Sequence, residues 1–218
     1  MLDNINQVGN GLNKKWIYAS SNKYELSCDY LQKVNYCIQD YNSIIKNIRG
    51  REDICFLILL VTWIKEACEQ IEKNVLNTLS TNFEYSDDDL LRLCNQYIRA
   101  LRSFVVAHPL STFKHEKYCL DGNYICVDIS CGETNTFLRA FSHYNKFFHF
   151  SINGLEEVDS IDKYDYRLHV YSKNDNLESF KYFGCTIEEL ELVAKTYLDK
   201  LKEFDHYLSR QKKKDYLG

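Results

Sequence analysis

Apolar residues recur every three or four positions along two long stretches at the start of the chain, which is the spacing of one face of an α-helix. The first stretch begins near Asn22 and ends before Gly50, because a glycine commonly occupies the position just after a helix. The second stretch runs from about Glu52 to about Leu79. The connection between them is very short, so the pattern predicts two helices packed as an antiparallel pair.

A third helix is predicted over residues 86–108, from the sequence SDDDLLRLCNQYIRALRSFVVAH. Ser86 followed by Asp89 resembles a capping box, and the acidic first turn suits the positive end of the helix dipole. Pro109, the only proline of the chain, disfavours helical geometry at His108, so we expect the helix to end there. Its buried seam is predicted to consist of Leu90, Cys94, Tyr97, Leu101 and Phe104.

The pattern changes between the third helix and Gly184. Residues 123–130 and 166–172 alternate between apolar and polar positions, which predicts two β-strands. Residues 135–144 predict a short helix, and the KFFHFSI stretch that follows fits neither period clearly. We therefore expect a small α+β insertion at 110–184, built on a β-hairpin or small sheet.

A last helix follows Thr186, which forms a capping-box pair with Glu189. Apolar residues then recur at helical spacing almost to the basic tail of the chain. The predicted fold class is mainly α, in a single domain over residues 1–218. Its core is a bundle of four long helices formed by residues 22–108 and 186–214, with the insertion between the third and fourth helices.

Composition bounds the possible partners. The chain has 218 residues, enough to bury a core, and a formal net charge of −4. This charge gives no overall attraction to nucleic acid, so binding RNA would require a local basic patch. The sequence holds no G-x-G-x-x-G, Walker, H-E-x-x-H or G-x-S-x-G pattern, and we expect no cofactor.

The nine cysteines and the apolar runs predict a cytoplasmic protein. The cysteine count is odd, and the first residues lack the apolar core of a signal peptide, so we expect free thiols in a reducing compartment. Cys37, Cys68 and Cys94 fall on the predicted apolar stripes, where a thiol packs as a small hydrophobe. The apolar run at 55–64 is far too short to span a bilayer, so we expect no membrane contact.

The end of the third helix carries the candidate chemistry, in Arg99, Arg102 and His108. Arg99 and Arg102 share a face because they are three residues apart. On a regular helix Arg102 and His108 lie roughly 9 Å apart along the axis and about 120° apart around it. They therefore converge only if the last turn unwinds or if a second copy of the chain supplies the facing set. A structural interpretation also fits, since arginine and histidine at a helix end stabilise the dipole and cap carbonyl groups.

The segment Arg102-Ser-Phe-Val-Val-Ala-His108 resembles the R-x4–6-H motif of the HEPN superfamily. The resemblance implies a helical bundle and a metal-independent endoribonuclease of the kind found in toxin–antitoxin and phage-defence systems. RNA would be cleaved by attack of its 2′-hydroxyl, with His108 as general acid and base and Arg102 as phosphate clamp. Arg99 and Ser103 would bind the substrate, although Ser103 stands where the family most often has Asn, Asp or His. A homodimer would complete the cleft, and an antitoxin or other protein is an expected partner.

The same resemblance leaves room for a protein without catalysis. Some HEPN proteins only bind partners, so an alternative is a helical protein whose insertion at 110–184 recognises a protein or a nucleotide. In that case His108 is a structural cap.

Two further groups of residues are candidates for binding a ligand, one for a zinc ion and one for RNA bases. A zinc site in the insertion is conceivable, but the spacing lacks the C-x2-C knuckle of structural zinc sites, so no metal is predicted. Its candidate ligands are His115, Cys119, Cys126 and Cys131. A basic and aromatic surface suited to RNA bases is the other possibility, and it would consist of Arg139, His143, Lys146 and His149.

Overall fold

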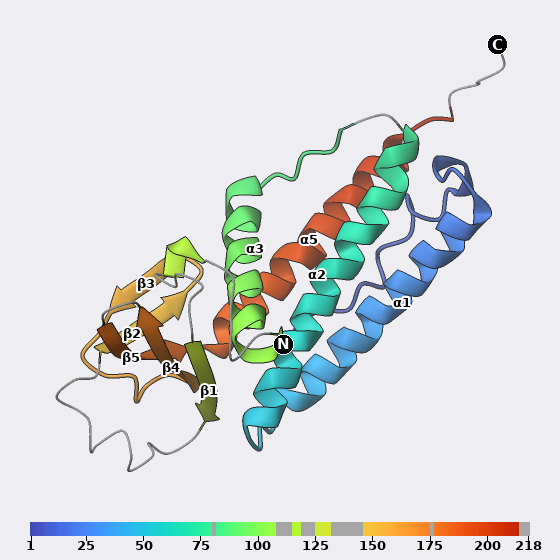
Figure 1. Cartoon of the computed structure of the whole chain (residues 1–218). Helices are drawn as coiled ribbons and strands as arrows, with labels where there is room; N and C mark the ends of the chain where they lie inside the picture. The colour runs from blue at the N-terminus through green and yellow to red at the C-terminus, as the bar shows by residue number, and fades with distance from the viewer. Residues whose placement is uncertain (80–81, 108–114, 119–124, 132–145, 175–176, 214–218) are drawn as a thin grey trace.

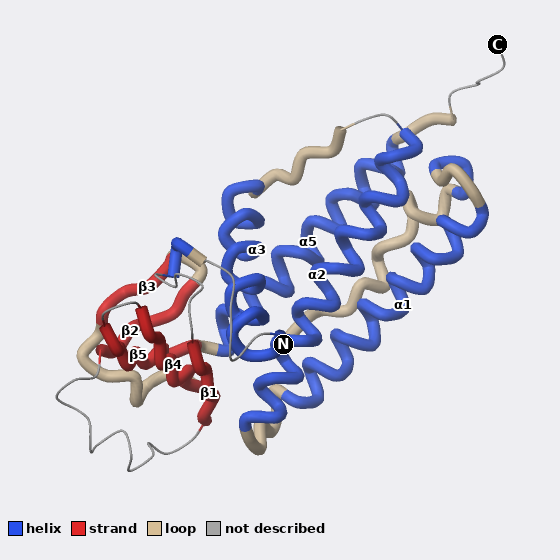
Figure 2. The backbone as a smooth tube through the Cα atoms, in the orientation of Figure 1, coloured by secondary structure: helices blue, strands red, loops and turns tan. Residues whose placement is uncertain are grey.

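A computed structural model of the chain describes residues 1–79, 82–107, 115–118, 125–131, 146–174 and 177–213. In this part of the chain, four long helices lie side by side and a β-sheet stands at one end of them (Figure 1). The helices are α1 (Ser21–Ile44), α2 (Arg51–Leu79), α3 (Asp88–Arg102) and α5 (Ile187–Arg210). Figure 2 shows the two kinds of structure segregated, with the sheet next to the end of α3 and the start of α5.

The helical bundle agrees closely with the apolar stripes. The pairs α1–α2 and α2–α5 are in contact along their lengths, as the predicted antiparallel hairpin requires. Cys37, Cys68 and Cys94 are buried free thiols, which confirms their prediction as core residues. None of the helices in the described part of the chain has the length and apolarity needed to cross a membrane.

The third helix differs from its prediction at both ends. Asp87, not Ser86, is the N-cap, and its carboxylate accepts the N–H of Leu90 at 3.1 Å. Ser86 instead binds Glu203 of α5 through its hydroxyl and backbone N–H groups. At the other end α-helical geometry stops at Arg102, and a π-helical turn, η2 (Ser103–Ala107), follows.

The prediction of a small insertion built on a β-hairpin or small sheet is wrong. The insertion contains a five-stranded mixed sheet in the order β1-β4-β5-β2-β3. Its strands are β1 (Ile125–Cys131), β2 (Lys146–Ser151), β3 (Gly154–Glu157), β4 (Tyr166–Asn174) and β5 (Leu177–Cys185). The two predicted strands correspond to β1 and β4, which pair antiparallel. The predicted helix at 135–144 lies outside the described residues.

The unpredicted strands are those whose partners are distant in sequence. β2 pairs with β5 in parallel and with β3 antiparallel, so it is an inner strand of the sheet. Inner strands can be covered on both faces and then lack the alternation that marks a half-exposed strand. On one face of β2, Phe148 and Phe150 pack on Phe183 of β5, and on the other face Phe147 packs on Tyr182.

One apolar core joins the bundle to the sheet. Phe150 lies 5.2 Å from the ring centroid of Tyr97 in α3 and 4.3 Å from that of Tyr118. It also contacts Phe104 of the π-helical turn. Because aromatic contacts of this kind contribute to packing, the end of α3 is held directly against the sheet.

The first residues of the chain are part of this core and not a free arm. Leu2, Ile5 and Leu12 are buried. The N–H groups of Gly11 and Leu12 donate to one carboxylate oxygen of Asp205 at 2.9 and 2.8 Å. This buried carboxylate therefore attaches the N-terminal segment to α5.

Candidate functional site

The end of α3 presents two arginines just before an irregular turn. Arg99 and Arg102 lie in the last turn of the α-helix, and Ser103–Ala107 then form the π-helical turn η2. Single-turn π-helices are rare overall, but those that do occur are often at functional sites. They also change the angular spacing, so the α-helical estimate for Arg102 and His108 does not apply beyond Arg102.

The side chain of Arg102 extends from α3 to α2. Its guanidinium lies 3.4 Å from the carboxylate of Glu66, and each side chain is 47% exposed. An ion pair this open to water is worth little, at about 0–1 kcal/mol. The guanidinium is therefore held in place on the surface but remains exchangeable for a stronger anionic partner.

Arg99 has no such partner. Among the described residues, no ion pair or hydrogen bond involves its exposed guanidinium. Burial lowers the pKa of the nearby His115, and the positive charge of Arg99 lowers it further. The His115 ring packs edge-on against Phe104 with centroids 5.2 Å apart, and its buried Nε2 atom has no hydrogen-bond partner. Among the described residues, Arg99 thus offers a positive charge without an acidic partner, which makes this helix end locally suited to an anion.

The other two residues proposed from the sequence are placed differently. His108 lies outside the described residues. Ser103 is buried, with 8% of its surface exposed, and so does not share the open face of Arg99 and Arg102. The structure thus brings together the two arginines, and it adds His115, which the sequence suggested only as a zinc ligand.

Neither of the two alternative binding groups is assembled in the described residues. No cluster of three or more His, Cys, Asp or Glu side chains able to hold a metal ion occurs there. Cys119, Arg139 and His143 lie outside that part of the chain, and so does the Cys126 side chain. His149 is not a surface residue of a basic patch, because it points toward α5.

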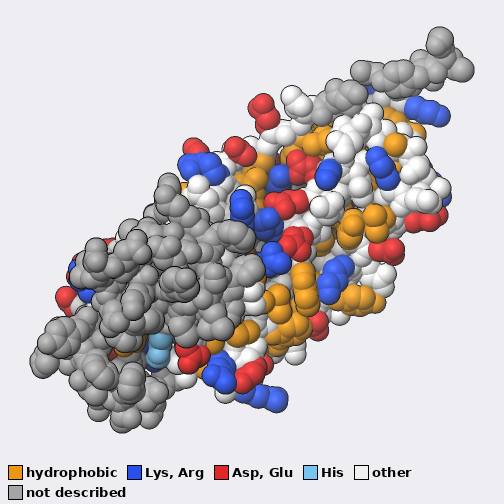
Figure 3. All heavy atoms as spheres, viewed as in Figure 1, with side chains coloured by type: hydrophobic (Ala, Val, Ile, Leu, Met, Phe, Trp, Pro, Cys, Tyr) orange, Lys and Arg blue, Asp and Glu red, His pale blue; other side chains and the backbone are white. Residues whose placement is uncertain are grey.

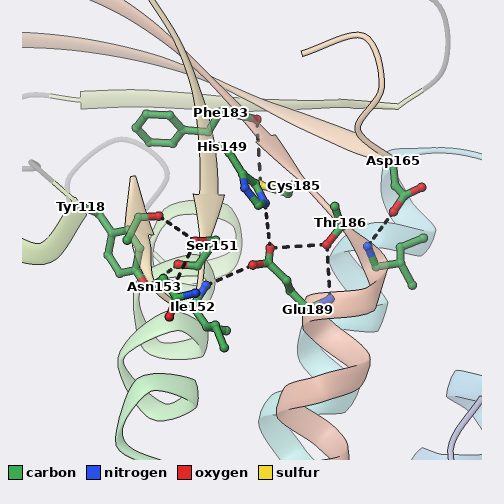
Figure 4. Close-up of polar contacts among 12 residues, drawn as sticks. Tyr118, His149, Ser151, Ile152, Asn153, Asp165, Phe183, Cys185, Thr186 and Glu189 are labelled. Carbon is green, nitrogen blue, oxygen red and sulfur yellow. Dashed lines mark hydrogen bonds and ion pairs between the residues drawn. The ribbon is translucent and has the colours of Figure 1, made fainter. Parts of the chain in front are cut away.

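His149 and Glu189 meet between the sheet and the start of α5 (Figure 4). The Nε2 atom of His149 lies 3.6 Å from the Glu189 carboxylate, and the two side chains are 26% and 13% exposed. The other carboxylate oxygen of Glu189 accepts the N–H of Ile152 at 3.1 Å. The ring of Tyr164 covers His149, with centroids 4.9 Å apart.

Burial sets the protonation of this pair. It raises the pKa of Glu189 to about 7, although the hydrogen bonds from Ile152 and Thr186 act in the opposite direction. Burial also lowers the pKa of His149, an effect partly opposed by the charge of Glu156. Both shifts favour the uncharged form of each group inside the junction. Sequence reasoning identified Glu189 only as the capping partner of Thr186, a role that the Thr186 N-cap confirms.

Ile152 connects this junction to α3. Its N–H donates to Glu189, and its carbonyl oxygen accepts a hydrogen bond from the Lys117 ammonium. The same ammonium lies 3.4 Å from the side-chain oxygen of Gln96 on α3. The turn between β2 and β3 is thus tied to both helices.

Comparison of the chain with family models, with curated proteins and with solved structures finds no match.

Figure 3 shows basic, acidic and apolar side chains intermixed over the helices on this face of the molecule. This mixture agrees with the overall charge of −4. Any attraction for a polyanion must therefore come from a local group of basic residues.

Proposed function

We propose that this chain is a HEPN-like, metal-independent endoribonuclease that acts at the end of α3, in the manner of a toxin or phage-defence effector. The observation that supports it most is the exposed pair Arg99 and Arg102 directly before a π-helical turn, where Arg99 has no acidic partner among the described residues. Guanidinium groups bind phosphate oxygens through paired, charge-assisted hydrogen bonds, and RNA supplies phosphates at regular spacing.

The proposed reaction divides the work between a histidine and the arginines. His108 takes the proton of the 2′-hydroxyl, whose oxygen attacks the adjacent phosphorus. The bond to the 5′-oxygen breaks, and His108, now protonated, acts as the general acid that gives this oxygen its proton. Arg102 and Arg99 stabilise the negative charge that builds on the phosphate oxygens. The products are a 2′,3′-cyclic phosphate and a 5′-hydroxyl, and DNA is not cleaved because it lacks the attacking group.

A second copy of the chain is part of this proposal. The resemblance of the Arg102–His108 segment to the HEPN motif supports it, because a homodimer usually completes the cleft in that superfamily. A homodimer would bring the arginines of one protomer toward the histidine of its partner. We place this dimer in the cytoplasm and expect a protein antitoxin to restrain it.

The test is to incubate purified protein with mixed RNAs in EDTA. Wild type should release fragments that end in a 2′,3′-cyclic phosphate, and His108→Ala should not. An equal absence of such fragments from both proteins would refute the proposal.

The second candidate is a non-catalytic protein that binds a protein or nucleotide through the insertion. The size of the sheet favours it, since five strands offer more surface than a hairpin. It predicts that His108→Ala lowers the melting temperature without removing any activity, so a thermal melt of this variant separates the two.

A further inference from the structure

A cavity of about 490 Å³ opens where the first turns of α2 meet η2 and β1. Its volume lies within the range of about 300–1,000 Å³ that is usual for small-ligand sites. It is lined by Arg51, Glu52, Cys55, Phe56, Leu59, Val105, Val127, Asp128 and Ile129.

The apolar wall of the cavity includes an accessible aromatic ring. Phe56 is 36% exposed, although it is a large hydrophobic residue in the middle of a helical turn. Its ring stands edge-on to Trp63, with centroids 6.1 Å apart, so the ring is braced from one side. A braced and exposed aromatic ring is the kind of platform on which nucleobases stack in single-strand binding proteins.

The polar wall comes from the edge of the sheet. Three consecutive residues of β1, Val127, Asp128 and Ile129, line the cavity. Because successive side chains of a strand point to opposite faces of the sheet, all three can line one cavity only if the edge of the strand faces it. β1 is the first strand of the sheet and pairs only with β4 among the described strands. The carboxylate of Asp128 accepts the N–H of Ile129 at 2.8 Å and lies 3.7 Å from the Arg51 guanidinium.

These charged groups match the edge of a base better than a phosphate. Asp128 and Arg51 are 69% and 60% exposed, so both can exchange their mutual contact for a ligand. A carboxylate accepts hydrogen bonds from exocyclic amino groups, and a guanidinium donates to ring nitrogens and carbonyl oxygens. Glu52 adds a second carboxylate, which disfavours a phosphate in the cavity itself.

The cavity lies between the same two helical segments that the contact of Arg102 with Glu66 joins, closer to the start of α2. Val105 follows Arg102 by three residues on the same helical segment, and Leu59 precedes Glu66 by seven residues on α2. Seven residues of α-helix correspond to about 10 Å along the axis. Phe56 precedes Glu66 by ten residues, which is about 15 Å along the axis, so an RNA strand with a phosphate at Arg102 has a base a few nucleotides away within reach of Phe56.

We propose that the cavity between α2, η2 and β1 is a nucleobase pocket that holds a base a few nucleotides from the scissile phosphate, stacked on Phe56 and read by Asp128 and Arg51. This inference deepens the proposed function and rests on it for the identity of the substrate. The preferred bases are those with an exocyclic amino group, namely adenine, cytosine and guanine.

The test uses 2′-O-methyl oligonucleotides, which bind but are not cleaved, so the measurement does not depend on catalysis. The chain has two tryptophans, Trp16 and Trp63. In a Trp16→Phe variant the fluorescence of Trp63 reports what happens beside Phe56. We expect a saturable change on titration with a mixed-sequence oligonucleotide, and a weaker response to an all-uridine one.

Variants then assign the binding to the cavity. Phe56→Ala should raise the Kd of a labelled oligonucleotide about tenfold, as expected for loss of one stacked base. Asp128→Asn should reduce the difference in Kd between oligonucleotides with and without amino-bearing bases, but it should not raise the Kd tenfold as Phe56→Ala does. Leu26→Ala removes another exposed apolar side chain, on α1 and outside the cavity, and should leave the Kd unchanged. Thermal melts of all variants establish that they fold.

Each outcome decides one of the two proposals. If RNA is not cleaved but oligonucleotides bind in a Phe56-dependent way, the proposed function fails and the pocket stands. If RNA is cleaved while Phe56→Ala binds like Leu26→Ala and Trp63 does not respond, the pocket is refuted alone. A Trp63 response to extended peptides in place of oligonucleotides would also refute it, in favour of strand addition at β1.

Discussion

The guanidinium of Arg102 and the carboxylate of Glu66 lie 3.4 Å apart and join α3 to α2 at the mouth of the candidate site. Both groups are about half exposed, so this ion pair is weak and another anion can compete with Glu66 for the guanidinium. Under the proposed function, Glu66 orients Arg102 before RNA binds and competes with the RNA phosphate for it.

Replacing Glu66 should therefore favour RNA. Glu66→Gln removes the competing charge, and we expect RNA affinity to rise by about 2- to 5-fold, the equivalent of an exposed ion pair of up to about 1 kcal/mol. Fluorescence anisotropy with a non-cleavable oligonucleotide measures this. Glu69→Gln is the matched control, because Glu69 lies on the same helix but pairs with Lys65. Equal effects of the two changes would show that only overall charge matters.

Arg99 should matter more for RNA than another arginine of the same helix. It has no acidic partner among the described residues, whereas Arg92 lies 3.3 Å from Asp89. A hydrogen bond to a charged group is worth about 1.5–3 kcal/mol, so Arg99→Ala should lower kcat/KM for RNA by tenfold or more. Arg92→Ala should change it by less than about threefold. If the two variants lose activity equally, Arg99 is not a specific phosphate ligand.

Glu189 should make stability depend on pH. Its pKa is raised from 4.5 to about 7 in the folded chain, so the folded state holds this proton more tightly than the unfolded state. The contribution is fully present below the unfolded value and is lost as pH rises through 7. We expect wild type to lose about 2–3 kcal/mol relative to Glu189→Gln between pH about 5 and pH about 8.

Urea unfolding at several pH values between about 5 and about 8 measures the difference in unfolding free energy between wild type and Glu189→Gln. His149 acts with the opposite sign, because its lowered pKa reduces stability as pH falls below its ordinary value of 6.5. His149→Gln in both backgrounds removes that contribution. Parallel stability curves for wild type and Glu189→Gln would show that the Glu189 carboxyl is not perturbed.

Gly11 should be intolerant of a side chain. A Cβ atom at this position would lie 2.1 Å from the backbone oxygen of Asp205, which cannot move aside easily. Gly11→Ala should therefore destabilise the fold by about 1–3 kcal/mol or more, as overpacking does. At Gly50 the nearest atom is the end of the flexible Glu52 side chain, at 3.0 Å, so Gly50→Ala should change stability by less than about 0.5 kcal/mol. Similar melting temperatures for the two variants would argue against the packing of the N-terminal segment on α5.

The four helices were predictable because each has its own apolar stripe and, in α5, a local capping signal. Thr186 shows this, since its side chain accepts the N–H of Glu189 as the sequence indicates. The start of α3 was misplaced by one residue because three consecutive aspartates follow Ser86, and each of them is a good cap. Local sequence alone therefore could not decide which of these residues is the N-cap of α3.

The sheet and the second function of Glu189 were not predictable in the same way. The parallel pairing of β2 with β5 joins residues about 35 positions apart, for example Phe148 with Phe183, and nothing local in either stretch reveals it. Glu189 faces His149 only because this pairing brings β2 to the start of α5. The arginines of the candidate site could be named from sequence, whereas the lack of a partner for Arg99 required the fold.

The central claim is that Arg102 and His108 direct a 2′-hydroxyl attack on RNA without metal. The most direct measurement is mass spectrometry of the products formed from one defined RNA in EDTA by wild type, Arg102→Ala and His108→Ala. We predict 2′,3′-cyclic phosphate and 5′-hydroxyl ends from wild type only, and no cleavage when the nucleotide before the cleaved bond is 2′-deoxy. Products with 3′-hydroxyl and 5′-phosphate ends, or equal cleavage by all three proteins, would contradict the account.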